Sequence, residues 1–97
     1  MTGSPQQRLE ARVVGRVQAV GFRWWVVDQA TALGLVGWVR NGTDDRSVEL
    51  VAEGSAEAVA TFEDRLRRGP PASRVDELDA RRQVARGGMT GFQIRRG

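Results

Sequence analysis

Apolar and polar residues alternate along several short stretches of the chain, and two longer stretches repeat their apolar residues at helical spacing. The first alternation places Leu9, Ala11 and Val13 on one face and Glu10 and Arg12 on the other, which predicts a strand. In chain order, the predicted elements are a strand at 9–17, a helix at 22–33, strands at 36–41 and 48–54, a helix at 56–68, and strands at 74–84 and 92–95. The pattern at 74–84 is the weakest of these.

Residues that start and stop helices mark the ends of both predicted helices. Gly34 follows the first helix, where a left-handed residue commonly ends the last turn. Ser55 precedes the second helix as an N-cap, and Gly69 with two prolines ends it. The order β-α-β-β-α-β-β predicts an α+β fold, namely a ferredoxin-like split βαβ sandwich with a short terminal strand. In this fold an antiparallel sheet carries two helices on one face.

The length of 97 residues suits one domain, and 40% of the residues are hydrophobic, as in ordinary globular proteins. Residues 1–7 are polar and include Gly and Pro, so we predict a flexible leader there and a single domain over 8–97. No apolar run reaches the length of a membrane span, and residues 1–8 lack the apolar stretch of a signal peptide. We therefore expect a cytoplasmic protein with no membrane partner.

The composition excludes several kinds of catalysis. The chain has no Cys, His or Tyr, which excludes Ser/His/Asp and Cys/His mechanisms within one chain and zinc sites built from histidine. All 15 basic residues are arginine, and 12 acidic residues leave a net charge of +3. This charge favours anionic ligands mildly, and it is too small by itself to indicate a nucleic-acid partner.

The segment between the first strand and the first helix carries the candidate chemistry. A turn here can direct successive backbone N–H groups at one point, where the helix N-terminus adds free N–H groups and its positive dipole end. Arg23, in the first helical turn, adds a planar guanidinium that matches a phosphate. The candidate phosphate-binding residues are Gln18, Ala19, Val20, Gly21, Phe22 and Arg23. Taken alone, Arg23 also fits a solvated surface arginine, and Asn41 before Gly42 fits an ordinary turn.

Residues 15–41, GRVQAVGFRWWVVDQATALGLVGWVRN, resemble the signature of the acylphosphatase family. That signature reads G-x-V-Q-G-V-x-F-R, then a helix, then G-L-x-G-W-V-x-N. Two shorter segments, PASRV at 71–75 and FQIR at 92–95, resemble further parts of the family pattern, so the resemblance spans about 9–97. Two matched blocks at a fixed separation are far more specific than a single glycine motif.

The resemblance implies an enzyme that hydrolyses the carboxyl-phosphate anhydride of an acyl phosphate to a carboxylate and inorganic phosphate. It implies that Arg23 and the backbone N–H groups of residues 18–23 hold the phosphate and that the Asn41 side chain orients the water. No metal or cofactor is implied, and nothing in the sequence demands more than a monomer.

The sequence departs from the family pattern in two places. Ala19 stands where the family usually has glycine, which would strain the loop by roughly 1–2 kcal/mol if this position needs a positive φ. The turn at residues 42–47 is one residue longer than in the pattern and lacks its glycine.

Two other functions remain open from the residues alone. A non-catalytic phosphate-binding regulatory domain would share the loop without turning over substrate. A single-strand RNA-binding module would share the fold, but it needs aromatic residues on the central strands, and residues 48–54 have none. Among the tryptophans, the spacing predicts Trp25 and Trp38 in the core and Trp24 partly exposed, with plain packing favoured over contact with a substrate.

Overall fold

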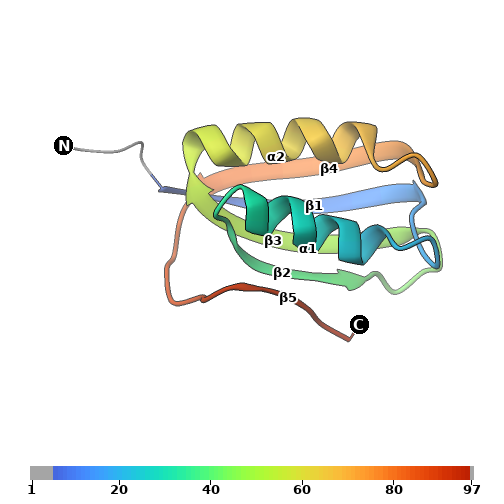
Figure 1. Cartoon of the computed structure of the whole chain (residues 1–97), viewed down its shortest axis with the longest axis horizontal. Helices are drawn as coiled ribbons and strands as arrows, with labels where there is room; N and C mark the ends of the chain where they lie inside the picture. Colours follow the sequence, from blue (N-terminus) through green and yellow to red (C-terminus); the bar gives the residue numbers. More distant parts are fainter. Residues whose placement is uncertain (1–5, 97) are drawn as a thin grey trace.

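The computed structural model describes residues 6–96 and has an α+β architecture, in which two helices cover one face of a five-stranded sheet (Figure 1). The elements are β1 (Gln6–Arg16), α1 (Phe22–Ala32), β2 (Val36–Asn41), β3 (Ser47–Ser55), α2 (Ala56–Arg68), β4 (Arg74–Val84) and β5 (Phe92–Ile94). These bounds agree closely with the predicted elements. Because β1 begins at Gln6, the last two residues of the leader predicted over 1–7 belong to a strand, and the rest of it lies outside the described residues.

The strands lie in the order β4-β1-β3-β2-β5, and the first four are antiparallel to their neighbours. This order confirms the ferredoxin-like fold. The prediction of a wholly antiparallel sheet is wrong for β5, which pairs parallel to β2 through Phe92, Gln93 and Ile94. The connection after β4 crosses to the far edge at the end of the sheet where β2 begins, so β5 runs beside β2 in the same direction (Figure 1).

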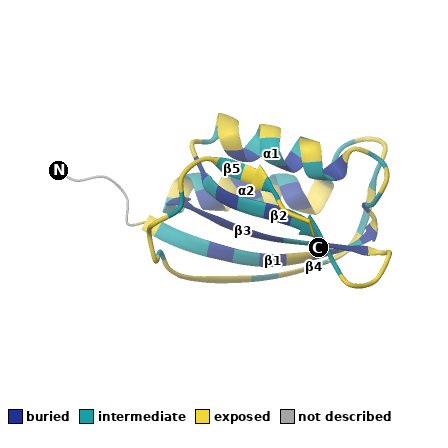
Figure 2. Cartoon of the chain, turned by 90° about the horizontal axis from the view of Figure 1, so that it is seen from below, coloured by how far each residue is buried: buried dark blue, intermediate teal, exposed yellow. Residues whose placement is uncertain are grey.

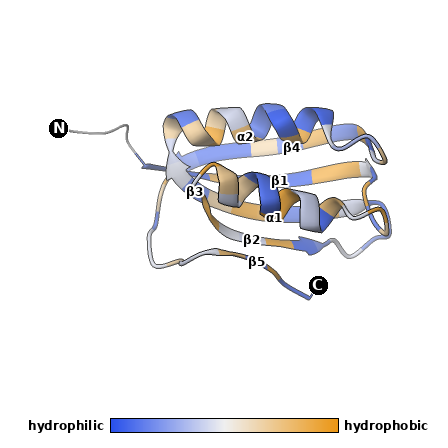
Figure 3. Cartoon of the chain, viewed as in Figure 1, coloured by the Kyte–Doolittle hydropathy of each residue, from blue (hydrophilic) through white to orange (hydrophobic). Residues whose placement is uncertain are grey.

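The core lies between the sheet and the helices, as Figure 2 shows by its buried residues. Alternate positions of β1 and β3 point toward the helices, and each helix supplies one apolar stripe (Figure 3). The fully buried side chains of the helices are Phe22, Val26 and Ala30 from α1 and Val59, Phe62 and Leu66 from α2. The predicted N-cap is confirmed, since Ser55 Oγ accepts a hydrogen bond of 3.1 Å from the backbone N–H of Ala58.

Trp38 lies outside the core, so its predicted place there is wrong. It is half-buried on the sheet face away from the helices, where the guanidinium carbons of Arg40 and Arg95 lie 5.0 and 4.8 Å from its ring centre. The reason is strand alternation, because Val39 takes the inward position of β2 and is completely buried. Trp25 does pack against the core, beside the Phe22 ring, and Trp24 is 69% exposed.

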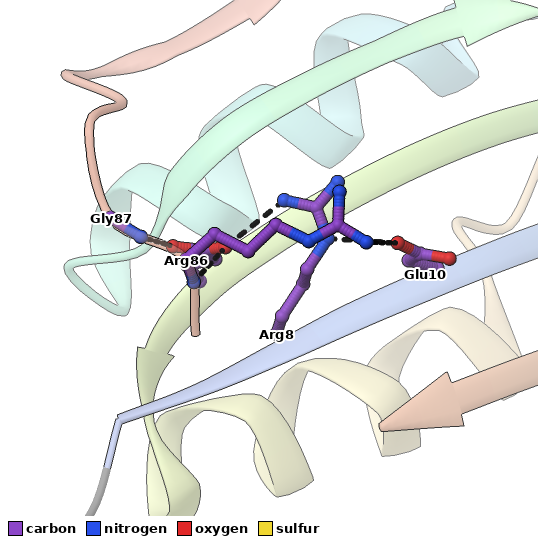
Figure 4. A network of polar contacts seen from close by, with 5 residues as sticks. Arg8, Glu10, Arg86 and Gly87 are labelled. Carbon is purple, nitrogen blue, oxygen red and sulfur yellow. Dashed lines mark hydrogen bonds and ion pairs between the residues drawn. The ribbon is translucent and has the colours of Figure 1, made fainter. Parts of the chain in front are cut away.

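The connection from β4 to β5 is fastened by the buried carboxylate of Glu53, on β3. This carboxylate accepts hydrogen bonds of 3.0 Å from the backbone N–H groups of Arg86 and Gly87 and from the Arg8 guanidinium (Figure 4). Arg8 also bonds Glu10 at 2.8 Å. Burial alone would raise the pKa of Glu53, but these donors outweigh it and hold the pKa below its ordinary value.

Candidate active site

Three connections meet at one end of the sheet: the β1–α1 loop, the β2–β3 turn and the α2–β4 turn (Figure 1). The first connection contains the predicted phosphate loop and leads directly into α1. Arg23 is the second residue of α1, and Asn41 is the last residue of β2. The fold therefore brings the two predicted catalytic residues to the same end of the sheet from positions 18 residues apart in the sequence.

The phosphate loop turns sharply because two of its residues have positive φ. Ala19 has a φ of +60°, and Gly21 has a φ of +77° and serves as the N-cap of α1. Consecutive residues in right-handed and left-handed conformations are the geometry that gathers backbone N–H groups around an anion. The departure at Ala19 therefore falls on a position where glycine is the favourable residue.

Close packing of the backbone fixes where this loop begins. The pairing of β1 with β4 shifts between Val14 and Gly15, and a Cβ at Gly15 would collide with the carbonyl oxygen of Arg74. On its other side, the N–H of Gly15 donates a hydrogen bond of 2.9 Å to the carbonyl of Arg46, in the β2–β3 turn. Only glycine fits there, so the loop starts from a rigid point between two neighbouring connections.

The N-terminus of α1 has no side-chain cap, in contrast to that of α2. Gly21 offers no side-chain acceptor, and the first turn of α1 contains no acidic residue. The first turn of α2 has both a Ser55 cap and Glu57. Free backbone N–H groups and a positive dipole end without a nearby carboxylate make the start of α1 a suitable place for an anion.

The Arg23 side chain is half-buried and forms no hydrogen bond or ion pair with any residue in the range 6–96. Several other arginines are paired, such as Arg12 with Asp44 at 2.7 Å and Arg40 with Glu49 at 3.0 Å. A guanidinium is expensive to withdraw from water without a partner. Its free donors therefore favour an anionic ligand next to the uncapped helix.

Asn41 also lacks a partner. Its side-chain oxygen Oδ1 is buried and accepts no hydrogen bond within the described part of the chain. The residue is held in place by the strand, where it pairs with Val48, and by the following turn, where the N–H of Gly42 donates to the carbonyl of Ser47 at 2.9 Å. A buried acceptor without a donor calls for a water molecule or a ligand.

Gln18 ties the phosphate loop to the hairpin that carries Asn41. Its side-chain Nε2 donates two hydrogen bonds of 2.8 Å, one to the carbonyl of Asp44 and one to the carbonyl of Ser47. The motif predicts a role for the backbone of Gln18 only, and this role of the side chain is seen only in the structure. No local signal could have revealed it, because the two acceptors lie 26 and 29 residues away.

The longer β2–β3 turn keeps a defined shape without the family's glycine. Asp44 Oδ1 accepts from the backbone N–H of Arg46 at 3.0 Å, and Asp44 Oδ2 accepts from the Arg12 guanidinium at 2.7 Å. Of the remaining predicted residues, Val20 and Gly21 lie in the loop, and Phe22 points its side chain into the core, so that only its backbone can serve a phosphate.

Two further observations concern metal ligands and membrane-spanning helices. Within residues 6–96, no group of three or more acidic, His or Cys side chains is placed to hold a metal ion. Neither α1 nor α2 is long and apolar enough to cross a membrane.

Comparison with known proteins identifies the family. The family model described as Acylphosphatase matches residues 9–94. An acylphosphatase of Methylococcus capsulatus is 48% identical over 90 residues, which cover 93% of this chain and 97% of that protein. The crystal structure of an acylphosphatase from Bacillus subtilis superposes with a TM-score of 0.85 at 36% identity and covers 91% of this chain and 97% of that one. An acylphosphatase structure from Coxiella burnetii gives a TM-score of 0.87 at 32% identity over 98% of this chain and 100% of that one. Because the family model and these relatives each match nearly the whole of it, this chain belongs to the acylphosphatase family.

Proposed function

We propose that this acylphosphatase binds the phosphate of its substrate with Arg23 and the backbone N–H groups of residues 18–23, and that Asn41 orients the attacking water. The substrate is an acyl phosphate, and the products are a carboxylate and inorganic phosphate. The observation that carries the proposal is the pair of unsatisfied side chains, Arg23 and Asn41, at the end of the sheet where α1 begins without a cap.

The reaction needs little covalent help from the protein. In phosphoryl transfer, the transition state is loose, and catalysis depends mainly on positioning and on stabilising charge on the equatorial oxygens. The guanidinium of Arg23 and the N–H groups of the loop supply that stabilisation. The bond that breaks joins phosphorus to the acyl oxygen, and its electron pair leaves with a carboxylate, which is a good leaving group. A strong general acid is therefore unnecessary in a chain that contains no histidine.

Asn41 supplies the orientation of the nucleophile. Its buried Oδ1 can accept a hydrogen bond from water, which directs an oxygen lone pair toward phosphorus, opposite the leaving group. The Gln18 side chain contributes indirectly, because it fixes the hairpin that carries Asn41 against the phosphate loop. We regard the Gln18 side chain as a positioning group, in contrast to the Arg23 and Asn41 side chains, which contact the reactants.

Hydrolysis of benzoyl phosphate by two variants tests the assignment. Arg23→Ala removes most of the activity and leaves the fold intact, as measured by circular dichroism. Asn41→Ala lowers kcat because it raises the activation free energy by about 2–4 kcal/mol, the effect of losing one preorganised hydrogen-bonding group. Arg81→Ala is the matched control, because Arg81 is an exposed arginine of β4 near the opposite end of the sheet and forms no ion pair with residues 6–96. Activity like that of the unmodified protein in either of the first two variants would refute its role.

One observation favours a second candidate, a domain that binds phosphate without turnover. The strained conformation of Ala19 could hold the loop too far from the productive geometry. The same benzoyl phosphate assay decides between the two, since a non-catalytic domain binds inorganic phosphate and releases no benzoate.

The proposal also includes a monomer that acts in the cytoplasm without nucleic acid or membrane as partner. The open face of β3, the central strand, supports the exclusion of RNA, because it presents Glu49, Val51 and Glu53 and no aromatic side chain. A labelled single-stranded RNA that binds with strong salt dependence would overturn this part of the proposal.

A further inference from the structure

A recess of about 630 Å³ lies beside the phosphate loop, at the same end of the sheet. Its wall includes Gly15 and Arg16, at the end of β1, and Gln18, at the start of the phosphate loop. The β2–β3 turn lines it with Asp45 and Arg46, and the start of β4 with the preceding turn lines it with Pro71, Ala72, Ser73 and Arg74. Its volume suits a small molecule.

The side chains that line the recess are mainly positively charged. Three guanidiniums line it, those of Arg16, Arg46 and Arg74, against the single carboxylate of Asp45. Arg46 and Arg74 share one further carboxylate, that of Asp76, at 2.7 and 2.9 Å. Arg16 forms no ion pair with any of residues 6–96, and in the strand register it stands directly opposite Arg74.

Like charges directly opposite each other on neighbouring strands repel, and an anion between them relieves the repulsion. Two acids near the recess are already paired: Asp76 with Arg46 and Arg74, and Asp44 with Arg12. The exposed guanidinium of Arg16 is therefore open to an anion from outside the chain. Gln18 lines the recess and is also the first residue of the loop that holds the phosphate, so the recess borders the phosphate site on this side.

We propose that this recess binds the acyl half of the substrate and selects acyl phosphates whose acyl group carries a second anionic group, with Arg16 as its principal contact. The inference rests on the proposed function, since it concerns the same substrate. It adds the chemical class of the acyl group, which neither the phosphate loop nor Asn41 determines.

Two substrates of similar size and shape that differ in that charge test the proposal: 4-carboxybenzoyl phosphate and its neutral amide, 4-carbamoylbenzoyl phosphate. The unmodified protein has a kcat/KM about fivefold higher for the carboxylate at low salt, and the preference shrinks as ionic strength rises. Arg16→Gln and, separately, Arg74→Gln bring the ratio of the two kcat/KM values close to one. Arg81→Gln is the control, because it removes the same charge from the same face and leaves the ratio unchanged.

The outcomes separate this inference from the proposed function. Equal kcat/KM values for the two substrates in the unmodified protein, or an Arg16→Gln variant that keeps the preference, would overturn the anion-selective recess while benzoyl phosphate hydrolysis stands. An equal loss in the ratio with Arg81→Gln would show a general effect of net charge and overturn it as well. If benzoyl phosphate itself is not hydrolysed, the proposed function fails and the recess has no substrate to select.

Discussion

The left-handed conformation of Ala19 leads to a quantitative prediction about stability. The residue is exposed and has a φ of +60°, where a Cβ costs roughly 1–2 kcal/mol. Glycine at this position removes that strain, but it gains freedom in the unfolded chain worth about 0.4–1 kcal/mol. The difference predicts that Ala19→Gly raises the free energy of unfolding by about 0.5–1 kcal/mol.

Gly21 provides the reverse experiment two residues away. It has a φ of +77°, and an added Cβ would meet no atom within 4 Å, so Gly21→Ala introduces backbone strain without a steric clash. Here the Cβ adds backbone strain, and the unfolded chain loses the freedom of glycine. We expect this variant to be less stable by about 0.5–1 kcal/mol. The pair separates the effect of backbone conformation from any effect of packing.

Urea denaturation and thermal melting measure both changes. For a domain of this size, such a difference shifts Tm by about 2–6 °C, upward for Ala19→Gly and downward for Gly21→Ala. Turnover of benzoyl phosphate, measured alongside, shows whether the strain also limits the phosphate loop in catalysis. A lower midpoint for Ala19→Gly, or a higher one for Gly21→Ala, would refute the argument, because it would mean that φ at these positions does not govern the free energy.

Two further side chains give predictions through the contacts they make. Gln18→Ala should lower kcat by about tenfold to a hundredfold with a smaller change in KM, because the loop and the Asn41 hairpin lose their two shared hydrogen bonds. Steady-state kinetics measure both constants, and Gln93→Ala, at an exposed glutamine, is the control. A Gln18→Ala variant in which only KM rises would contradict the prediction. Glu53→Gln should lower the free energy of unfolding, measured by urea denaturation, by about 3 kcal/mol, because it breaks a buried ionic network. Its control is Glu10→Gln, at the solvent-exposed edge of the same network, which should lower it by less than about 1 kcal/mol. Because the pKa of Glu53 is lowered in the folded state, its contribution is present above about pH 4.5 and is lost as the pH falls through the lower folded value. The Glu53→Gln variant should therefore lose less stability on acidification, and equal acid sensitivity of the two proteins would argue against the network.

Local patterns were sufficient to predict most of the fold. Alternation along β1 and β3 and the stripes of α1 and α2 act within a few residues, so the sequence shows them directly. The parallel pairing of β5 was missed because strand direction depends on how the connection crosses the sheet. The spacing predicts Trp38 in the core, but Val39 takes the inward position of β2, so the alternation turns Trp38 outward.

In the candidate site, too, some residues are predicted from the sequence, whereas some contacts are seen only in the structure. The positions of Arg23 and Asn41 follow from the motif and from the ends of the elements that carry them. The bridge from Gln18 to the carbonyl groups of Asp44 and Ser47 joins distant segments, and no periodicity encodes it. The arginines around the recess come from the end of β1, the β2–β3 turn and the start of β4, so their convergence is visible only in the folded chain.

The interior position of β1 has a consequence for how the protein is made. This strand is translated before both of its partners, since β3 and β4 begin at residues 47 and 74. Long loops must close before either ladder forms, which makes folding slower than in proteins with local pairings. The Glu53 carboxylate also cannot complete its hydrogen bonds until residues 86 and 87, which donate their N–H groups to it, have been synthesised. A nascent chain arrested before that point would hold a buried acid without its main-chain donors, so the domain completes its fold only after nearly all of it has been translated.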